Sequence, residues 1–239
     1  MRVYFFILIL PLLGFTQTNL QADISSKVSG QPSSYGSSFF YNPPNKVILG
    51  SYYLFDEWNN NGIIETISGE RFLVKKINLN MSRNAFEAKG ENDSIFSFNF
   101  NNIDKVIIND KVFKNYYYNE DNKVYQVIYE NDSFSLLKGF SVKLVSRSGN
   151  PMINRENDRY VRKQKYFLRN KKSKTIKYFK LNKRSISKLF TNKNKTQIEV
   201  DSFISENQLS FKDEKDVSKL LDYIFAVSYT HLTLPTTPV

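Results

Sequence analysis

Residues 111–145 read KVFKNYYYNEDNKVYQVIYENDSFSLLKGFSVKLV, and this stretch is the most informative about the fold. It holds three runs rich in β-branched and aromatic residues, at 111–118, 123–129 and 134–145, and such runs are typical of strands. The separators NEDN and END favour turns, because Asn and Asp side chains bond the neighbouring backbone. Links this short join antiparallel neighbours, since a parallel crossover needs a dozen residues or more. The stretch therefore predicts an antiparallel β-meander.

The same alternation of strand runs and turn signals begins at about residue 46. Ser68-Gly69 and Asn109-Asp110 stand where two-residue hairpin turns require positive φ. In the run SIFSFNF, at 94–100, the three Phe residues fall on one side and Ile, Ser and Asn on the other, which predicts one wet face. We therefore expect a meander over residues 46–145, formed as a curled sheet or closed as a small barrel.

The chain after residue 145 has a different character. A polar connector and then two basic strand-like runs, 160–168 and 175–181 around NKKSK, predict a basic hairpin within 146–195. Ile186, Leu189 and Phe190 have helical spacing, and Ile198 with Phe203 suggests a second helix. Residues 213–225 carry apolar side chains at i, i+3, i+4 and i+7, which predicts a third. Strands followed by two or three short helices, in 196–226, make the expected class α+β.

The first seventeen residues, MRVYFFILILPLLGFTQ, have the order of a secretory signal peptide. The apolar run covers about 13 residues and contains Pro11, whereas a membrane-spanning helix needs roughly 20. A membrane anchor or a buried first strand is the alternative. We therefore expect export to the periplasm, the cell envelope or the medium. Residues 18–45, rich in Ser, Gln, Asn, Gly and Pro, are expected to be a flexible lead-in.

The last residues, 227–239, depart from the rest in composition. They lack Asn and Lys, which are abundant elsewhere, and they contain His231, the only histidine of the chain. The phrase SYTHLTLPT resembles translated sequencing-adapter read-through. We therefore expect this tail to be an artefact outside the fold, with a genuine short strand as the alternative.

Charge is strongly segregated along the chain. The whole chain has a net charge of +11, yet residues 141–195 hold 18 basic and 2 acidic side chains. Residues 23–140 hold 12 and 14, and residues 196–225 hold 3 and 7. An AT-rich genome would raise Lys usage evenly, so codon usage does not explain this segregation. The chain has no Cys, which excludes disulfides, thiolate metal sites and Cys nucleophiles.

The basic segment interleaves cations with aromatic residues, a combination that favours polyanions. In an exported protein the expected partner is an acidic polysaccharide, lipopolysaccharide or a membrane surface, or else an acidic protein; nucleic acid is not expected after export. The alternative is a solvated hairpin that pairs with the acidic segment 196–225. The cations that we expect to contact an anionic ligand are Arg162, Lys163, Lys165, Arg169, Lys171, Lys172, Lys174 and Lys177.

Signals for catalysis are weak. Asp56 and Glu57 beside Trp58, with Glu65 nearby, are the candidate carboxylates for a glycan hydrolase. Adjacent strand residues point to opposite faces, however, so Asp56 and Glu57 would not converge without a bulge. No phosphate-binding or dinucleotide-binding glycine motif and no calcium-loop spacing is present, so neither a cofactor nor a metal is expected. A small outer-membrane β-barrel is a third alternative, which its short, Lys- and Glu-bearing strands disfavour.

The layout resembles a group of exported β-rich proteins of Gram-negative bacteria with AT-rich genomes. The resemblance is carried by FTQ at the end of the leader, by GSYYLFDEWNNNGII at 50–64, by INLN at 77–80, by DKVFKNY at 110–116 and by ENQLSFKDEKDVSKLLDYI at 206–224. It implies export and a β-rich fold, and it implies no activity.

Overall fold

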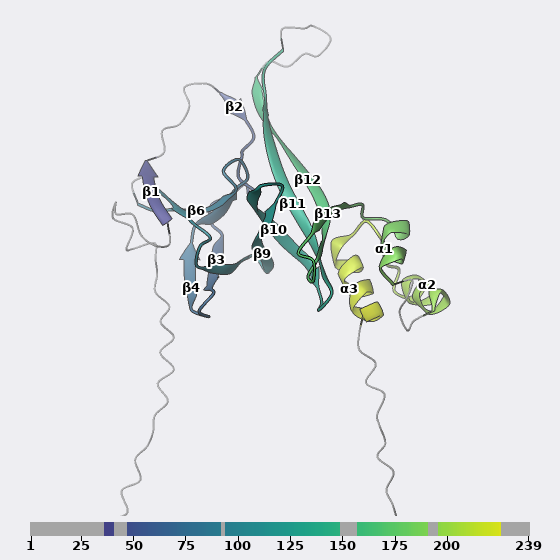
Figure 1. Ribbon diagram of the computed structural model, residues 1–239. Helices are drawn as coiled ribbons and strands as arrows, with labels where there is room; N and C mark the ends of the chain where they lie inside the picture. The colour runs from purple at the N-terminus through teal and green to yellow at the C-terminus, as the bar shows by residue number, and fades with distance from the viewer. Residues whose placement is uncertain (1–35, 41–46, 92–93, 149–156, 191–195, 226–239) are drawn as a thin grey trace, which may run out of the picture.

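The computed structural model describes residues 36–40, 47–91, 94–148, 157–190 and 196–225. The predicted signal peptide at 1–17 and the predicted artefactual tail at 227–239 lie outside these residues. Strands come first along the chain and helices last, so the predicted α+β class is confirmed (Figure 1). In the described residues the strands are β1 Gly36–Phe40, β2 Ile48–Leu49, β3 Asn61–Thr66, β4 Arg71–Lys75, β5 Ile77–Asn80, β6 Ala85–Lys89, β7 Ser94–Phe98, β8 Ile103–Ile108, β9 Lys111–Tyr118, β10 Asp121–Glu130, β11 Phe134–Val145, β12 Asp158–Asn170 and β13 Ile176–Phe179; the helices are α1 Lys183–Phe190, α2 Gln197–Glu206 and α3 Glu214–Phe225.

The larger sheet contains the predicted meander. Strands β8 to β13 pair antiparallel in chain order, β3 and β4 extend the β8 edge, and the short β2 pairs parallel with β12. Asn109 and Asp110 both have positive φ, at 49° and 62°, which confirms the hairpin turn predicted there. The pairing order begins at β13 and ends at β4, so across the described strands the sheet takes the curled form and not the closed barrel.

The smaller sheet has the order β1-β7-β6-β5 and lies at the left of Figure 1. β1 falls within the segment predicted to be a flexible lead-in, and it pairs antiparallel with β7. In β7, Phe96 and Phe98 are buried as the alternation predicts. Ile95 is only 3% exposed, so the opposite side of this strand is not the fully wet face that the alternation predicts.

Two large apolar cores, and a smaller cluster around Tyr125, Leu137 and Ile176, stabilise the described part of the molecule. In the first, side chains of the larger sheet such as Val106 and Phe113 pack against Leu79 and Phe86 of the smaller sheet. In the second, the β10–β11 end of the larger sheet packs against the three helices, which gather at the right of Figure 1. The buried residues of α3 are Val217, Leu220, Leu221 and Ile224, which confirms the predicted i, i+3, i+4, i+7 stripe.

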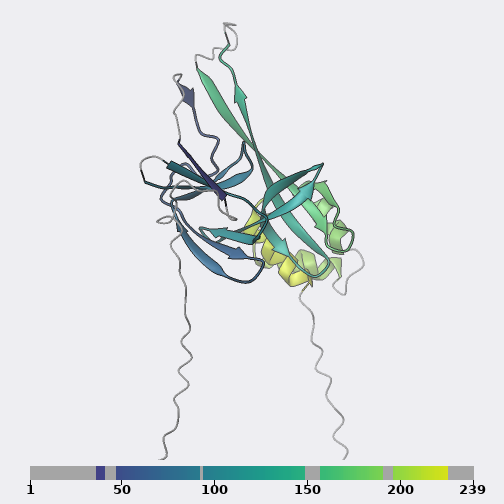
Figure 2. The same cartoon turned by 60° about the vertical axis from the view of Figure 1, so that its left-hand side comes forward.

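The β11–β12 hairpin is the longest pairing of the molecule that the described residues contain. Its register runs without interruption from Phe134 opposite Asn170 to Val145 opposite Arg159. Both views show these two strands rising past the rest of the fold (Figures 1 and 2). The base of the hairpin is therefore held between cores, and its upper part presents a strand surface with few neighbours.

Candidate functional site

The two faces of the β11–β12 hairpin have different surroundings. Side chains alternate between faces along a strand, and directly opposite residues share a face. Leu136 opposite Leu168 packs into the helix core, and we call this side the helix face. Leu137 opposite Phe167 belongs to a different cluster, and we call this side the outer face. The outer face also carries Ser135 opposite Arg169, Gly139 opposite Lys165 and Ser141 opposite Lys163.

Five aromatic side chains from four strands form a continuous row on the outer face. The Phe167 ring lies 5.6 Å from Tyr118, 5.4 Å from Tyr125 and 6.3 Å from Tyr178, measured between ring centroids. The Tyr116 ring lies 6.3 Å from that of Tyr125. We call Tyr116, Tyr118, Tyr125, Phe167 and Tyr178 the aromatic row. Edge-to-face aromatic pairs of this kind stabilise by about 0.5–1.5 kcal/mol beyond their buried area.

Gly139 makes this row possible. It lies on β11, opposite Tyr125 of β10 and diagonal to Phe167 of β12, which is opposite Leu137. A Cβ at this position would lie 2.9 Å from Phe167 Cε2 and 3.0 Å from Tyr125 Cε1. The two rings therefore close over the strand only because residue 139 has no side chain.

Cations and one carboxylate border the aromatic row. The Arg169 guanidinium lies 4.4 Å from the centre of the Tyr116 ring, and Lys123 lies 5.8 Å from that of Tyr118. Glu130 Oε1 accepts from Lys171 at 3.0 Å and from Ser135 Oγ at 3.1 Å, and its Oε2 accepts from Lys114 at 3.3 Å. Burial and the nearby Glu130 charge raise the pKa of Tyr116 to about 12, although Arg169 acts to lower it. The Tyr116 phenol therefore stays protonated at neutral pH.

Glu130 is held as an anion by these neighbours. Burial acts to raise its pKa, but the hydrogen bond from Lys171 and the charge of Lys114 outweigh that effect, and the pKa is lowered. Its charge is thus shared between two lysines, and the other hairpin cations are not offset by it.

The structure divides the eight cations predicted for ligand binding into two groups. Arg162 is bound to the loop before β3: its Nε donates to Ser51 O at 3.0 Å, and its second amino group pairs with Asp56 at 2.7 Å. Arg169 covers Tyr116, and Lys171 pairs with Glu130. The remaining lysines have no ion-pair partner among the residues that the structure describes: Lys163, Lys165, Lys172, Lys174 and Lys177.

The acidic helices engage other cations. Glu214 at the start of α3 accepts from Lys138 at 2.7 Å and from the Tyr166 hydroxyl at 2.6 Å, both on the helix face of the hairpin. Asp201 of α2 pairs with Lys183 at 3.0 Å. Lys138 belongs to β11 and lies outside the basic segment 146–195, from which Tyr166 and Lys183 contact the acidic helices. The ion pairs of the described residues connect none of the eight predicted cations to those helices.

The three carboxylates predicted for glycan hydrolysis lie in separate sets of contacts. Asp56 pairs with Arg162, while Glu65 pairs with Lys105 at 2.7 Å and with Arg71 at 3.6 Å across β8 and β4. Glu57 is exposed, and its described contacts are made by its backbone oxygen. The described hydrogen bonds and ion pairs do not bring any two of the three together.

A buried carboxylate that the sequence did not single out lies in the smaller sheet. Glu87 is completely buried; it accepts from the Tyr53 hydroxyl at 2.6 Å and from Asn80 Nδ2 at 3.1 Å, and it pairs with Arg83 at 3.4 Å. Burial and the hydrogen bond to Glu87 raise the pKa of Tyr53 far above its usual range. The Trp58 ring packs edge-on against Tyr53, at 4.5 Å between centroids.

These contacts give Glu87 a structural role, because they attach the loop over 50–58 to the smaller sheet. Asn78 of β5 supports the same loop, accepting from Phe55 N and donating to Phe55 O. The only signal in the sequence was one acidic residue inside the apolar run AFEAK.

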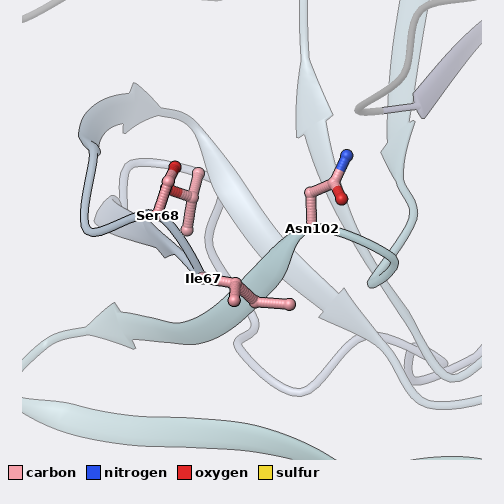
Figure 3. A pocket seen from close by; sticks show the side chains of 4 residues that line it. Ile67, Ser68 and Asn102 are labelled. Atoms are coloured by element: carbon pink, nitrogen blue, oxygen red, sulfur yellow. The ribbon is translucent and has the colours of Figure 1, made fainter.

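A pocket of about 400 Å³ lies at the β3–β4 turn, lined by Thr66, Ile67, Ser68 and Asn102 (Figure 3). The hydroxyls of Thr66 and Ser68 bond each other at 2.9 Å, and Thr66 Oγ1 also accepts from Glu70 N. The hydroxyls of Thr66 and Ser68 are therefore used in forming the turn. Within the described ranges, no cluster of three acidic, His or Cys side chains is arranged to hold a metal ion.

Comparison of the chain with protein-family models, with curated proteins and with solved structures found no match. Among the described residues, no helix combines the length and apolar character needed to cross a bilayer. The site must therefore be interpreted from its own chemistry.

The sequence indicated part of the aromatic row and missed the rest. Phe167 and Tyr178 lie in the basic segment and were visible there as interleaved aromatics. Tyr116, Tyr118 and Tyr125 come from earlier strands, and their shared face depends on the register of β9 and β10. The period-2 spacing of Tyr116 and Tyr118 was the only signal that could have indicated this face.

Proposed function

We propose that this protein is an exported envelope or secreted protein that binds an anionic polymer through its basic hairpin, which consists of β12, β13 and the turn between them. The observation that carries the proposal is the set of five lysines without a carboxylate partner in the described structure. Two of them, Lys163 and Lys165, lie on the outer face beside the aromatic row. The predicted signal peptide and the resemblance to exported β-rich proteins support the location.

Electrostatics explains why such a surface favours a polymer over a single small anion. Like charges gathered on one hairpin repel one another and sum to a positive potential over its surface. A polyanion that follows the hairpin meets several of these charges at once, so its attraction grows with length. Because exposed charges are screened within about 8 Å at physiological salt, binding of this kind weakens steeply as salt is added.

The ion pairs of the candidate acids support binding over catalysis. A retaining or inverting glycosidase needs two carboxyls facing each other across the scissile bond. Asp56 and Glu65 each face an arginine or lysine instead. The two best-placed candidates thus stabilise contacts between neighbouring segments.

The test is a binding titration of the full chain against three anionic probes: polygalacturonate, lipopolysaccharide and vesicles containing anionic phospholipid. The K163Q/K165Q variant should bind roughly thirtyfold more weakly, since each lysine near an anionic surface contributes about 1 kcal/mol. The matched control is K212Q/K215Q, which removes two exposed lysines from the acidic C-terminal segment. This control should bind as the unaltered chain does.

Each outcome has a defined meaning. Tightest binding to one probe identifies the source of the anion, and a steep loss of affinity with salt supports the proposal. Absence of binding at low salt, or binding that salt does not change, would exclude it. Export is tested separately by sequencing the N-terminus of the native product, which should begin after about residue 17 if the leader is removed.

A further inference from the structure

We infer that the aromatic row is the binding platform for sugar rings, so that the polyanion is an acidic polysaccharide. This inference rests on the anionic-polymer binding proposed above, and it names the chemical class of the polymer. Tyr116, Tyr118, Tyr125, Phe167 and Tyr178 form the row. Lys165, which has no ion-pair partner in the described part of the chain, lies next to Phe167 on the same strand face. Aromatic surface and positive charge therefore occur side by side, which matches a polymer whose apolar ring faces alternate with carboxylates.

The composition of the row favours a polyhydroxylated ligand. Four of its five members are tyrosines, whose phenols both donate and accept hydrogen bonds. Tyr178, at the β13 edge, is 64% exposed and offers ring and hydroxyl to solvent. Exposed aromatic side chains that combine an apolar body with a polar tip are typical of binding surfaces.

Tyr125 provides a second, independent observation. Its side chain is 2% exposed, and its hydroxyl has no hydrogen-bond partner among the residues that the structure describes. Burial, with a smaller effect of the neighbouring Tyr118 phenol, raises the pKa of Tyr125. Its hydroxyl therefore remains a donor. A buried donor without a partner is uncommon in folded proteins, and a sugar hydroxyl that entered the row would supply the missing acceptor.

The geometry of the rings disfavours nucleobases. A single-stranded nucleic acid stacks its bases on open aromatic faces. Here the rings of Tyr118, Tyr125 and Tyr178 stand at 63°, 76° and 85° to that of Phe167. Neighbouring rings are thus far from parallel, so a run of stacked bases would not find a run of matching faces, whereas one sugar ring needs a single ring surface such as that of the exposed Tyr178.

The experiment compares three probes on the full chain at equal charge concentration and equal salt: polygalacturonate, poly-L-glutamate and oligodeoxythymidine. Poly-L-glutamate carries the same carboxylates without sugar rings or hydroxyls. We expect polygalacturonate to bind more tightly than both others. Tyr178→Ala and Tyr125→Phe should each weaken polygalacturonate binding about fivefold, the effect of losing roughly one hydrogen bond or ring contact. Poly-L-glutamate binding should stay unchanged.

The matched control is Tyr117→Ala. Tyr117 is 68% exposed, close to the value for Tyr178, but it lies on β9 between Tyr116 and Tyr118 and so points to the opposite face. Tyr125→Phe keeps the ring and its packing, so it tests the hydroxyl without risking the fold.

The outcomes separate this inference from the function on which it rests. If the unaltered chain binds neither polygalacturonate nor poly-L-glutamate, anionic-polymer binding itself fails. If it binds both equally and the tyrosine variants behave as Tyr117→Ala does, the hairpin lysines remain a polyanion site and the sugar platform is wrong. Tighter binding of oligodeoxythymidine than of polygalacturonate would overturn the inference in favour of nucleic acid.

Discussion

The two faces of the β11–β12 hairpin are built from the same two strands and yet have different surroundings. On the helix face, Leu136 and Leu168 pack with Leu221 of α3 in an apolar core. On the outer face, Gly139 leaves room for an aromatic row bordered by cations. The net charge of a segment therefore does not show which of its charged side chains are paired within the fold. Strand parity decides which face a side chain joins, and the neighbours on that face decide whether its charge is paired.

Arg162 and Lys163 show this most directly. They are adjacent on β12 and carry the same charge. Arg162 binds the loop over 51–56 through two backbone oxygens and one carboxylate. Lys163, opposite Ser141 on the outer face, has no ion-pair partner within the described structure. If this division between neighbouring cations is right, substitutions on the two faces should differ in their effects on stability and on binding.

The first prediction concerns Gly139, over which the rings of Phe167 and Tyr125 close. Gly139→Val should lower the free energy of unfolding by about 1–3 kcal/mol, because its side chain would overlap Phe167 and Tyr125. Urea denaturation followed by tyrosine fluorescence measures the change. Ser141→Val, two residues along the same face at an exposed position, is the control and should change stability by less than about 0.5 kcal/mol. Equal stability of the two variants would show that the rings do not close over residue 139.

The second prediction compares the two neighbouring cations. Arg162→Gln should cost about 1–2 kcal/mol of stability, because Ser51 O and Leu54 O lose a charged donor that is only partly exposed. Lys163→Gln should cost less than about 0.5 kcal/mol, since its side chain is exposed and unpaired. In a polygalacturonate titration the order should reverse, with the larger loss of affinity for Lys163→Gln. If Arg162→Gln and Lys163→Gln lowered stability equally, the proposed difference between the two faces would be wrong.

The third prediction tests whether the ionised Glu130 carboxylate beside the aromatic row stabilises the fold, by varying pH. The pKa of Glu130 is lowered in the folded protein from its ordinary value of 4.5, so its ion pairs stabilise the fold above that pH. The stability is lost as pH falls through the lower, folded-state pKa. Glu130→Gln should therefore be less stable than the unaltered chain at pH 7, by less than about 1 kcal/mol since the pairs are partly exposed.

The difference in free energy of unfolding between Glu130→Gln and the unaltered chain should shrink when urea denaturation is repeated at pH values from about 5 down to about 3. Lys171→Gln removes the closest partner of Glu130 but leaves Lys114, so its stability should depend on pH less than that of the unaltered chain and more than that of Glu130→Gln. A difference that persists undiminished at pH 3 would mean that Glu130 acts through packing rather than through its charge.

The sequence predicted the order of the elements because local signals are strong in this chain. Turn residues such as Asn109 and Asp110 fix hairpins at short range, and the stripe on α3 has a clear period of 3.6. It did not predict that β5 to β7 leave the meander to form a second sheet, because the choice of strand partner depends on contacts far along the chain. For the same reason Ile95 was expected in water and is buried.

The periodicity of the strands and helices, the turns and the concentration of positive charge in one hairpin could be read from the sequence. Each of these features depends on residues that are close together in the chain. The three-dimensional packing was needed to show which cations have an ion-pair partner among the described residues. Register places Lys163 on the outer face and Arg162 against the loop over 51–56, and it brings Tyr116, Tyr125 and Phe167 together from three strands. These pairings are set by long-range packing, in which a shift of one residue would exchange the two faces.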